Sequence, residues 1–191
     1  MPDLEELYRE IILDHYRSPR NRGELESPPA HRVEGFNPLC GDEVVVTLLV
    51  EDGALADIRI GGTGCSISQS SASLMSAAVK GRPLPEVRHL IASFKSMMSI
   101  HESALGDDDG DGDGGGDGAG RLGDHPTTSP SNGLSPGPET VSGEPEPIDA
   151  AELGEVAALQ GVVKFPVRIK CATLSWNALA KGLVEIGANA D

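Results

Sequence analysis

One stretch of this 191-residue chain holds most of its net negative charge and half of its glycine, and it limits what the chain can fold into. Residues 103–152 contain twelve glycines, six prolines, eight aspartates and four glutamates against one arginine, a local charge of −11 out of −15 overall. A segment of this composition buries too little apolar surface to offset the entropy lost on ordering. We therefore expect one domain made of residues 1–102 and 153–191 together, interrupted by a disordered acidic insertion at 103–152.

Charge and hydropathy exclude two kinds of partner. A net charge of −15 argues against nucleic acid, because a phosphate backbone is bound through clustered positive charge. No run of 18 apolar residues exists, and the first residues, MPDLEELYRE, are acidic and amphipathic rather than basic and then apolar. We therefore expect a cytoplasmic protein with no membrane partner.

Hydrophobic spacing predicts the order of the secondary structure. Apolar residues at helical spacing predict an amphipathic helix over residues 3–16, and β-branched runs predict strands at 32–36, 43–51 and 54–61. The Asp52-Gly53 dipeptide between the last two strands suits a tight hairpin turn. Further helices are expected from Ser66, from Pro85, near 153–159, and immediately after Cys171. This order predicts an α+β domain, a small antiparallel sheet of about three strands with helices packed on one face.

Three cysteines, Cys40, Cys65 and Cys171, carry the strongest chemical signal. They are odd in number, widely spaced and without a CxxC pair, which favours thiol or metal chemistry over a disulfide framework. Cys65 and Cys171 each precede a predicted helix, where the free N–H groups stabilise a thiolate. Each cysteine taken alone could equally be a small buried hydrophobic residue.

Together these cysteines suggest a metal site. Gly41 allows a tight turn, so the Cys40 thiol and the Asp42 carboxylate can approach one point, and three thiolates plus one carboxylate make a tetrahedral set suited to zinc. Such a site needs nearby positive charge, which Arg168 and Lys170 could supply, although both could equally belong to a solvated strand face. Spacing alone does not establish that the three cysteine regions converge. The five histidines are scattered, and we treat them as surface or helix residues.

Four motifs resemble those of the U-type iron–sulfur assembly proteins, specifically the SufU branch of the IscU/NifU N-terminal scaffold family. They are LYREIILDHYRSPRNRG at residues 7–23, NPLCGDEV at 37–44, GTGCSISQSSASLM at 62–75 and LGEVAALQGVVKFPVRIKCATLSWNAL at 153–179. The resemblance implies an α+β scaffold in which the cysteines converge. Carried over residue by residue, it implies the metal ligands Cys40, Asp42, Cys65 and Cys171, with Arg168 beside the site in a supporting role.

The branch determines the implied function. IscU-type scaffolds have a histidine directly before the last cysteine, whereas this chain has Lys170 there and an extra segment between the second and third cysteines. The SufU resemblance implies a Zn²⁺-dependent protein whose Cys40 accepts persulfide sulfur from a pyridoxal-phosphate cysteine desulfurase (SufS-like), to supply a downstream iron–sulfur scaffold (SufB/C/D-like). Such a protein is a sulfurtransferase-type accessory rather than an independent catalyst. Two alternatives stay open: a scaffold that binds iron and a nascent Fe–S cluster on the same cysteines, and a zinc-stabilised interaction domain without sulfur chemistry.

Overall fold

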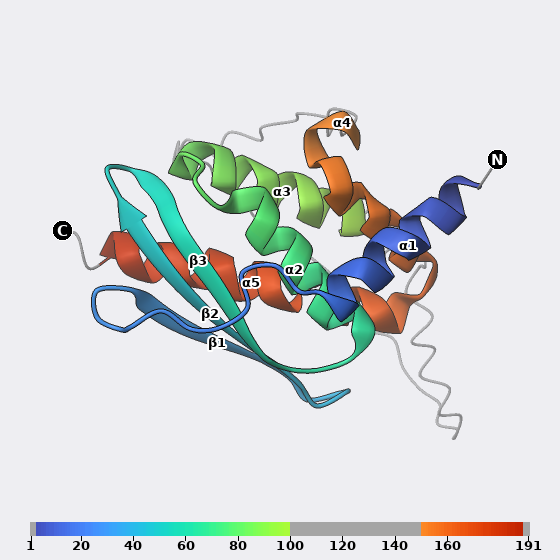
Figure 1. The fold of residues 1–191 in the computed structure, drawn as a ribbon, viewed down its shortest axis with the longest axis horizontal. Helices are drawn as coiled ribbons and strands as arrows, with labels where there is room; N and C mark the ends of the chain where they lie inside the picture. The colour runs from blue at the N-terminus through green and yellow to red at the C-terminus, as the bar shows by residue number, and fades with distance from the viewer. Residues whose placement is uncertain (1–2, 100–149, 189–191) are drawn as a thin grey trace, which may run out of the picture.

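The structure is a computed structural model that describes residues 3–99 and 150–188 (Figure 1). Its elements in chain order are α1 (Leu4–Arg17), β1 (His31–Asn37), β2 (Asp42–Glu51), β3 (Ala54–Thr63), α2 (Ser66–Val79), α3 (Leu84–Ser99), α4 (Ala150–Leu153), the 3₁₀ helix η2 (Gly154–Lys164) and α5 (Pro166–Ala188). The expected α+β class is confirmed. None of the described helices is long and apolar enough to cross a membrane.

The three strands form one antiparallel sheet in the order β1-β2-β3. The β2–β3 hairpin turns at Asp52 and Gly53, whose φ angles of 50° and 75° are the paired positive values of the predicted tight turn. At the other end of β2, Asn37 of β1 lies opposite Asp42, so the four residues 38–41 form the β1–β2 connection. The predicted strands are therefore confirmed, and the connection that carries Cys40 lies at one end of the sheet.

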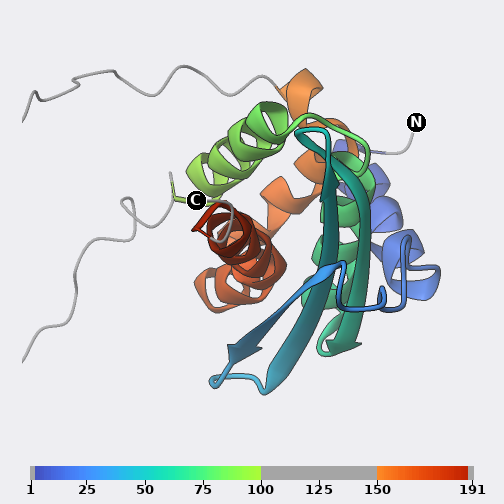
Figure 2. The same cartoon turned by 90° about the vertical axis from the view of Figure 1, so that its left-hand side faces the viewer.

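The helices cover the face of the sheet on which Val44, Val46 and Leu48 are buried. Figure 1 shows α5 passing behind the strands, and Figure 2 shows it from its end. Helix α5 approaches β1 and β2 closely enough that a Cβ on Gly182 would lie 2.8 Å from Val33 Cγ2 and 2.9 Å from Leu48 Cδ2. Phe94 of α3 stacks on Trp176 of α5 with ring centroids 4.2 Å apart, which ties the helices together inside the core.

The last helix starts earlier than predicted. Helix α5 begins at Pro166, so Cys171 lies in its second turn and not ahead of its first residue. Proline suits the first position of a helix, because its φ angle is already helical and its missing N–H would have had no intrahelical partner. The alternation of apolar and basic residues in Val167–Lys170 resembles a strand, which is why the sequence pattern misplaced this boundary.

His15, expected on the surface or on a helix, lies on helix α1 but is buried. It is 1% exposed on the inner side of α1, and its Nδ1 lies 2.8 Å from Ser73 Oγ on α2. Its spacing from Ile11 and Ile12 continues the apolar stripe of the helix, a signal that the sequence did contain.

Segments on either side of the acidic stretch pack into one core. Leu153, Val156 and Leu159 are buried in the same apolar cluster as the strands of the sheet. The predicted insertion at 103–152 lies, up to residue 149, outside the described residues, so its disorder stays a prediction.

Candidate metal centre

Cys40 lies on the exposed connection between β1 and β2. Asn37 holds this turn from within, because its side-chain Oδ1 accepts the Leu39 N–H at 3.1 Å and its backbone oxygen accepts the Gly41 N–H at 2.8 Å. Gly41 takes a φ of 71°, in the left-handed region that glycine adopts without strain. The turn leaves Cys40 exposed to solvent.

Asp42, the first residue of β2, is 3% exposed. Its Oδ1 accepts the backbone N–H of Cys65 at 3.0 Å, while its Oδ2 is buried without a hydrogen-bond partner. Burial raises the pKa of this carboxyl, but the neighbouring Cys40 thiol and the hydrogen bond from the Cys65 backbone outweigh it and hold the pKa below the ordinary value. The result is a carboxylate with one buried oxygen free, which is costly unless a cation binds it.

Cys65 caps the N-terminus of α2, as predicted. Its Sγ accepts the backbone N–H of Ser68 at 3.5 Å, so the thiol faces the positive end of the helix dipole. Gly64 makes this approach possible, since a Cβ there would lie 2.4 Å from Ser68 Oγ and 2.9 Å from Asp42 Cγ. The glycine thus lets the start of α2 pack directly against Asp42.

Cys171 is 2% exposed on α5, and its Sγ lies 3.5 Å from Cys40 Sγ. Burial raises the pKa of this thiol well above the ordinary value, and the neighbouring Cys40 and Cys65 raise it further. The expected stabilisation of a thiolate by a helix N-terminus is therefore wrong for Cys171. With no metal bound, this residue is a neutral thiol.

Three of the four predicted ligands come together. One donor atom each from Cys40, Asp42 and Cys171 all lie within 4.8 Å of one another. A tetrahedral zinc site with Zn–S bonds of about 2.3 Å separates its sulfurs by about 3.8 Å, so this spacing suits a shared ion. Cys65 lies outside that group but borders it, because its backbone N–H holds Asp42 and its thiol raises the Cys171 pKa.

This donor set fits a borderline or soft divalent ion. Thiolates favour zinc or iron over magnesium or calcium, and the free Asp42 Oδ2 provides a buried oxygen ligand. A bound cation would also reverse the pKa shift of Cys171, because metal coordination removes the thiol proton. The residues present therefore fit a metal ion.

The surroundings of the centre are apolar and basic. Leu39 on the turn and Val167 on α5, one helical turn before Cys171, are 68% and 73% exposed. Arg168 and Lys170 are exposed on the helix α5, not on a strand. Exposed apolar side chains grouped around a functional residue are typical of an interaction surface.

Two supporting residues were not identified from the sequence. Asn37 shapes the Cys40 turn, and Gly64 admits α2 to Asp42. The signal for Asn37 was its position directly before proline, since asparagine commonly bonds the backbone two residues on. For Gly64, the signal was a glycine directly before the helix-capping cysteine.

Comparisons with known proteins agree on the family and the fold. Residues 7–109 match the family model of the NifU-like N-terminal domain. The chain is 35% identical over 188 residues to the zinc-dependent sulfurtransferase SufU of Bacillus subtilis, covering 98% of this chain and 97% of that one. It is 32% identical over 187 residues to the iron–sulfur cluster assembly scaffold protein IscU of Streptococcus pyogenes, covering 98% and 88%.

The fold itself matches a crystal structure from Fervidobacterium islandicum, described as a cluster assembly scaffold protein for the SUF system. The TM-score is 0.65 at 22% identity, covering 95% of this chain and 99% of that one. At that identity the likeness establishes the α+β fold alone.

Proposed function

Because the chain belongs to the family of NifU-like N-terminal domains, we propose that it acts in iron–sulfur cluster assembly as a zinc-bound acceptor of persulfide sulfur. The sulfur donor is a pyridoxal-phosphate cysteine desulfurase, and the pyridoxal phosphate belongs to that partner. One observation carries the proposal: the sulfur of the exposed Cys40 lies 3.5 Å from the sulfur of the buried Cys171, and the buried Asp42 carboxylate lies beside both. The near full-length identity to a zinc-dependent sulfurtransferase supports the same activity.

Cys40, Asp42, Cys65 and Cys171 would hold the zinc ion. When bound, zinc keeps the thiols deprotonated near neutral pH, which matters most for Cys171, whose pKa is raised by burial. Asp42 contributes the oxygen that has no other partner. A carboxylate is a harder ligand than a thiolate, so this site exchanges ligands more readily than one made of four thiolates.

Cys40 is suited to be the sulfur acceptor because its thiol is exposed and lies on a turn rather than at a helix. Its thiolate attacks the terminal sulfur of the desulfurase persulfide, forming a new S–S bond at Cys40. The S–S bond in the desulfurase breaks, its cysteine leaves as a thiolate, and no net oxidation or reduction occurs. Cys65 and Cys171 are held on helices, where they stay as ligands while Cys40 reacts.

The surroundings of Cys40 suit a protein partner. Leu39 and Val167 offer apolar contact area to the desulfurase, and Arg168 provides positive charge for the anionic persulfide. The sulfur then passes to a downstream scaffold, in a cytoplasm reducing enough to keep the thiols free.

A second candidate function is a scaffold that assembles the Fe–S cluster on the same residues. Identity to the IscU scaffold protein supports it, because thiolates also bind iron. Lys170 stands where IscU-type scaffolds have a histidine, which favours sulfur transfer. Metal analysis and absorbance of the purified protein separate the two, since a zinc protein is colourless and a cluster absorbs visible light.

Incubation with a cysteine desulfurase and cysteine tests the proposal. We expect mass spectrometry to find one added sulfur, roughly 32 Da, on Cys40, and we expect the desulfurase to turn over faster with this protein than without it. Cys40→Ala should abolish the stimulation while still binding the desulfurase. Cys65→Ala should lose the metal and melt at a lower temperature, because the site links three distant segments.

Added sulfur on Cys65 or Cys171, or normal stimulation by Cys40→Ala, would show that the sulfur-transfer mechanism is wrong. Metal binding without any persulfide would instead favour a zinc-stabilised interaction domain. Full metal occupancy in Cys65→Ala would remove Cys65 from the ligand set.

A further inference from the structure

β1 is an open edge of the sheet. Among the described residues it pairs with β2 alone, whereas the far edge, β3, is covered because Ile60 exchanges backbone hydrogen bonds of 2.9 Å with Asn21 and Gly23. Every second residue of β1 therefore directs its N–H and C=O away from the sheet. An unpaired edge of this kind is a template for another strand.

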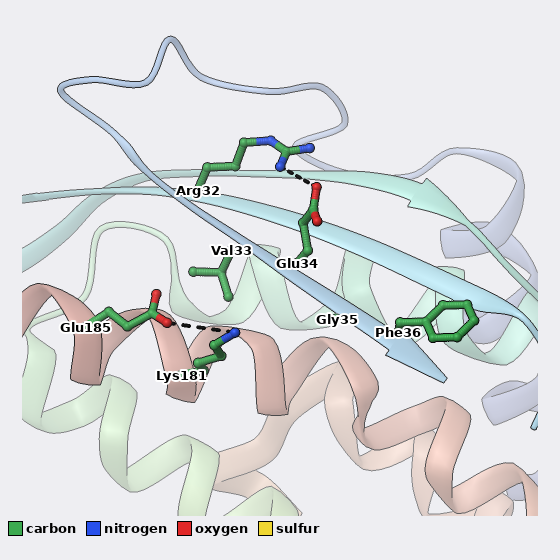
Figure 3. A pocket seen from close by; sticks show the side chains of 7 residues that line it. All are labelled: Arg32, Val33, Glu34, Gly35, Phe36, Lys181 and Glu185. Carbon is green, nitrogen blue, oxygen red and sulfur yellow. Dashed lines mark hydrogen bonds and ion pairs between the residues drawn. The ribbon is translucent and has the colours of Figure 1, made fainter. Parts of the chain in front are cut away.

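A groove of about 460 Å³ runs along this edge (Figure 3). One wall is β1 and the other is the C-terminal half of α5. Its lining residues are Arg32, Val33, Glu34, Gly35, Phe36, Lys181 and Glu185. Phe36 is 60% exposed, which is unusual for an aromatic side chain in a chain that has only six aromatic residues.

We propose that a second copy of this chain occupies the groove, with the two β1 strands paired antiparallel about a two-fold axis at Val33. The pairing would join the two sheets into one of six strands. A closed symmetric dimer of this kind uses the same surface on both copies, so the surface must be complementary to itself.

Charge on the outer face of β1 provides that complementarity. Arg32 and Glu34 are both exposed and lie on either side of Val33. A two-fold axis at Val33 places Arg32 opposite Glu34 of the second copy, twice per dimer. Opposite charges directly across an antiparallel pair stabilise it.

The neighbouring registers are unfavourable. Moving the axis to Arg32 places two arginines opposite each other, and moving it to Glu34 places two glutamates opposite each other. Like charges in that position destabilise a strand pair. The sequence of β1 therefore selects one register out of the three that centre on its middle residues.

Helix α5 repeats the same symmetry in the second layer. It runs antiparallel to β1, because Cys171 lies near the end of β1 while Glu185 bonds His31 at its start, with Nε2 to Oε2 at 2.6 Å. Gly182 of α5 packs against Val33 of β1, so the proposed two-fold axis passes close to this part of α5. Each α5 lies over both β1 and β2, so the two helices would be two strand spacings, about 10 Å, apart, a normal packing distance. Lys181 then faces Glu185 of the second copy, and both already border the groove.

The proposed dimer leaves the metal centres free. Cys40 lies beyond the end of β1 that is away from the axis, so the two centres come to opposite ends of the joined sheet. Dimerisation and sulfur acceptance therefore use separate surfaces.

Charge-reversal variants test the register as well as the dimer. In analytical ultracentrifugation of the full chain over a concentration series, the measured mass should approach twice the mass of one chain. Glu34→Arg places an arginine opposite each Arg32, so we expect repulsion between these like charges to weaken the dimer at least about tenfold. Arg32→Glu should weaken it similarly by placing glutamates opposite one another. An equimolar mixture of the two variants restores opposite charges and should form a mixed dimer.

Glu86→Arg on α3 is the matched control, because it reverses an exposed glutamate far from β1 and should leave the dimer unchanged. Circular dichroism of each variant establishes that the fold is retained. A chain that stays monomeric at every concentration overturns the proposal. That result would leave the edge of β1 to an extended segment of another protein. A dimer that Glu34→Arg leaves unchanged, or a mixture that stays monomeric, overturns the proposed register.

Discussion

Asp42 shows at the residue scale why the candidate centre suits a cation. The carboxylate is buried, and one of its oxygens has no hydrogen-bond partner. The neighbouring Cys40 thiol and the backbone N–H of Cys65 keep its pKa low, so it stays ionised. Cys171 beside it is a neutral thiol because burial raises its pKa. A divalent cation removes both costs together, by binding the free oxygen and by releasing the thiol proton.

Gly64→Ala should weaken metal binding without touching a ligand. The new Cβ would lie 2.4 Å from Ser68 Oγ and 2.9 Å from Asp42 Cγ, so either the start of α2 or the carboxylate has to move. We expect lower zinc stoichiometry by elemental analysis and a loss of about 1–3 kcal/mol in the free energy of unfolding. Gly61→Ala is the control, because its Cβ meets nothing closer than 3.7 Å. Equal zinc content in both variants would contradict this account of Gly64.

At the scale of elements, His15 connects three helices. It projects from α1, its Nδ1 lies 2.8 Å from Ser73 Oγ on α2, and its Nε2 lies 3.5 Å from Glu155 Oε2 on η2. The last distance is too long for a good hydrogen bond, so Nε2 is buried without a partner. Burial, followed by the nearby Arg20 charge, lowers the pKa of this imidazole despite opposing effects of Glu155 and Asp14.

A lowered histidine pKa makes stability fall as the pH decreases. In the unfolded chain His15 takes up a proton near its ordinary pKa of 6.5, while in the folded protein it stays neutral to lower pH. Between those two values, each pH unit costs up to about 1.4 kcal/mol of stability. Denaturant unfolding of the metal-free protein from about pH 7.5 to about pH 5.5 measures this slope.

His15→Gln, which cannot titrate, should make the slope shallower than in the unchanged protein. Equal slopes in the two proteins would contradict a role for His15.

The contact of α5 with the sheet gives a second prediction at this scale. Gly182→Ala should destabilise the fold by about 1–2 kcal/mol, because the strain of the added Cβ against Val33 and Leu48 exceeds the gain in helix propensity. Gly187→Ala, on the same helix with nothing within 4 Å of its Cβ, should instead stabilise it by up to about 1 kcal/mol. Thermal or denaturant unfolding compares the two. A gain in stability for both would mean that α5 shifts freely on the sheet.

The elements that could be predicted from the sequence are those fixed by local chemistry. The β2–β3 hairpin follows from Asp52-Gly53, and the N-cap of α2 follows from Cys65 before a run of small helix-compatible residues. The start of α5 could not be predicted from alternation, because Pro166 and packing on the sheet decide it. The burial of His15 could be predicted only from its position on the apolar stripe of α1, because histidine itself occurs both on surfaces and in cores.

At the scale of the whole molecule, the candidate metal centre joins parts of the chain that are far apart in sequence. The β1–β2 turn, the start of α2 and α5 each contribute, and 131 residues separate Cys40 from Cys171. Local pattern could suggest each cysteine as a ligand but could not establish their convergence, which depends on the packing of α5 over β1 and β2. The resemblance to a family supplied that step.

Deleting residues 106–146 should leave the fold and the centre intact. The deleted tract is acidic and rich in glycine and proline, and segments on both sides of it contribute to one apolar core. If the tract is disordered, as its composition predicts, shortening the connection from about fifty to about nine residues recovers closure entropy, so we expect stability to be unchanged or to rise by up to about 1.5 kcal/mol. Zinc stoichiometry should stay the same as in the full chain. A cooperative loss of more than about 2 kcal/mol in denaturant unfolding would show that the tract packs on the domain, because loop entropy alone cannot produce a loss of that sign.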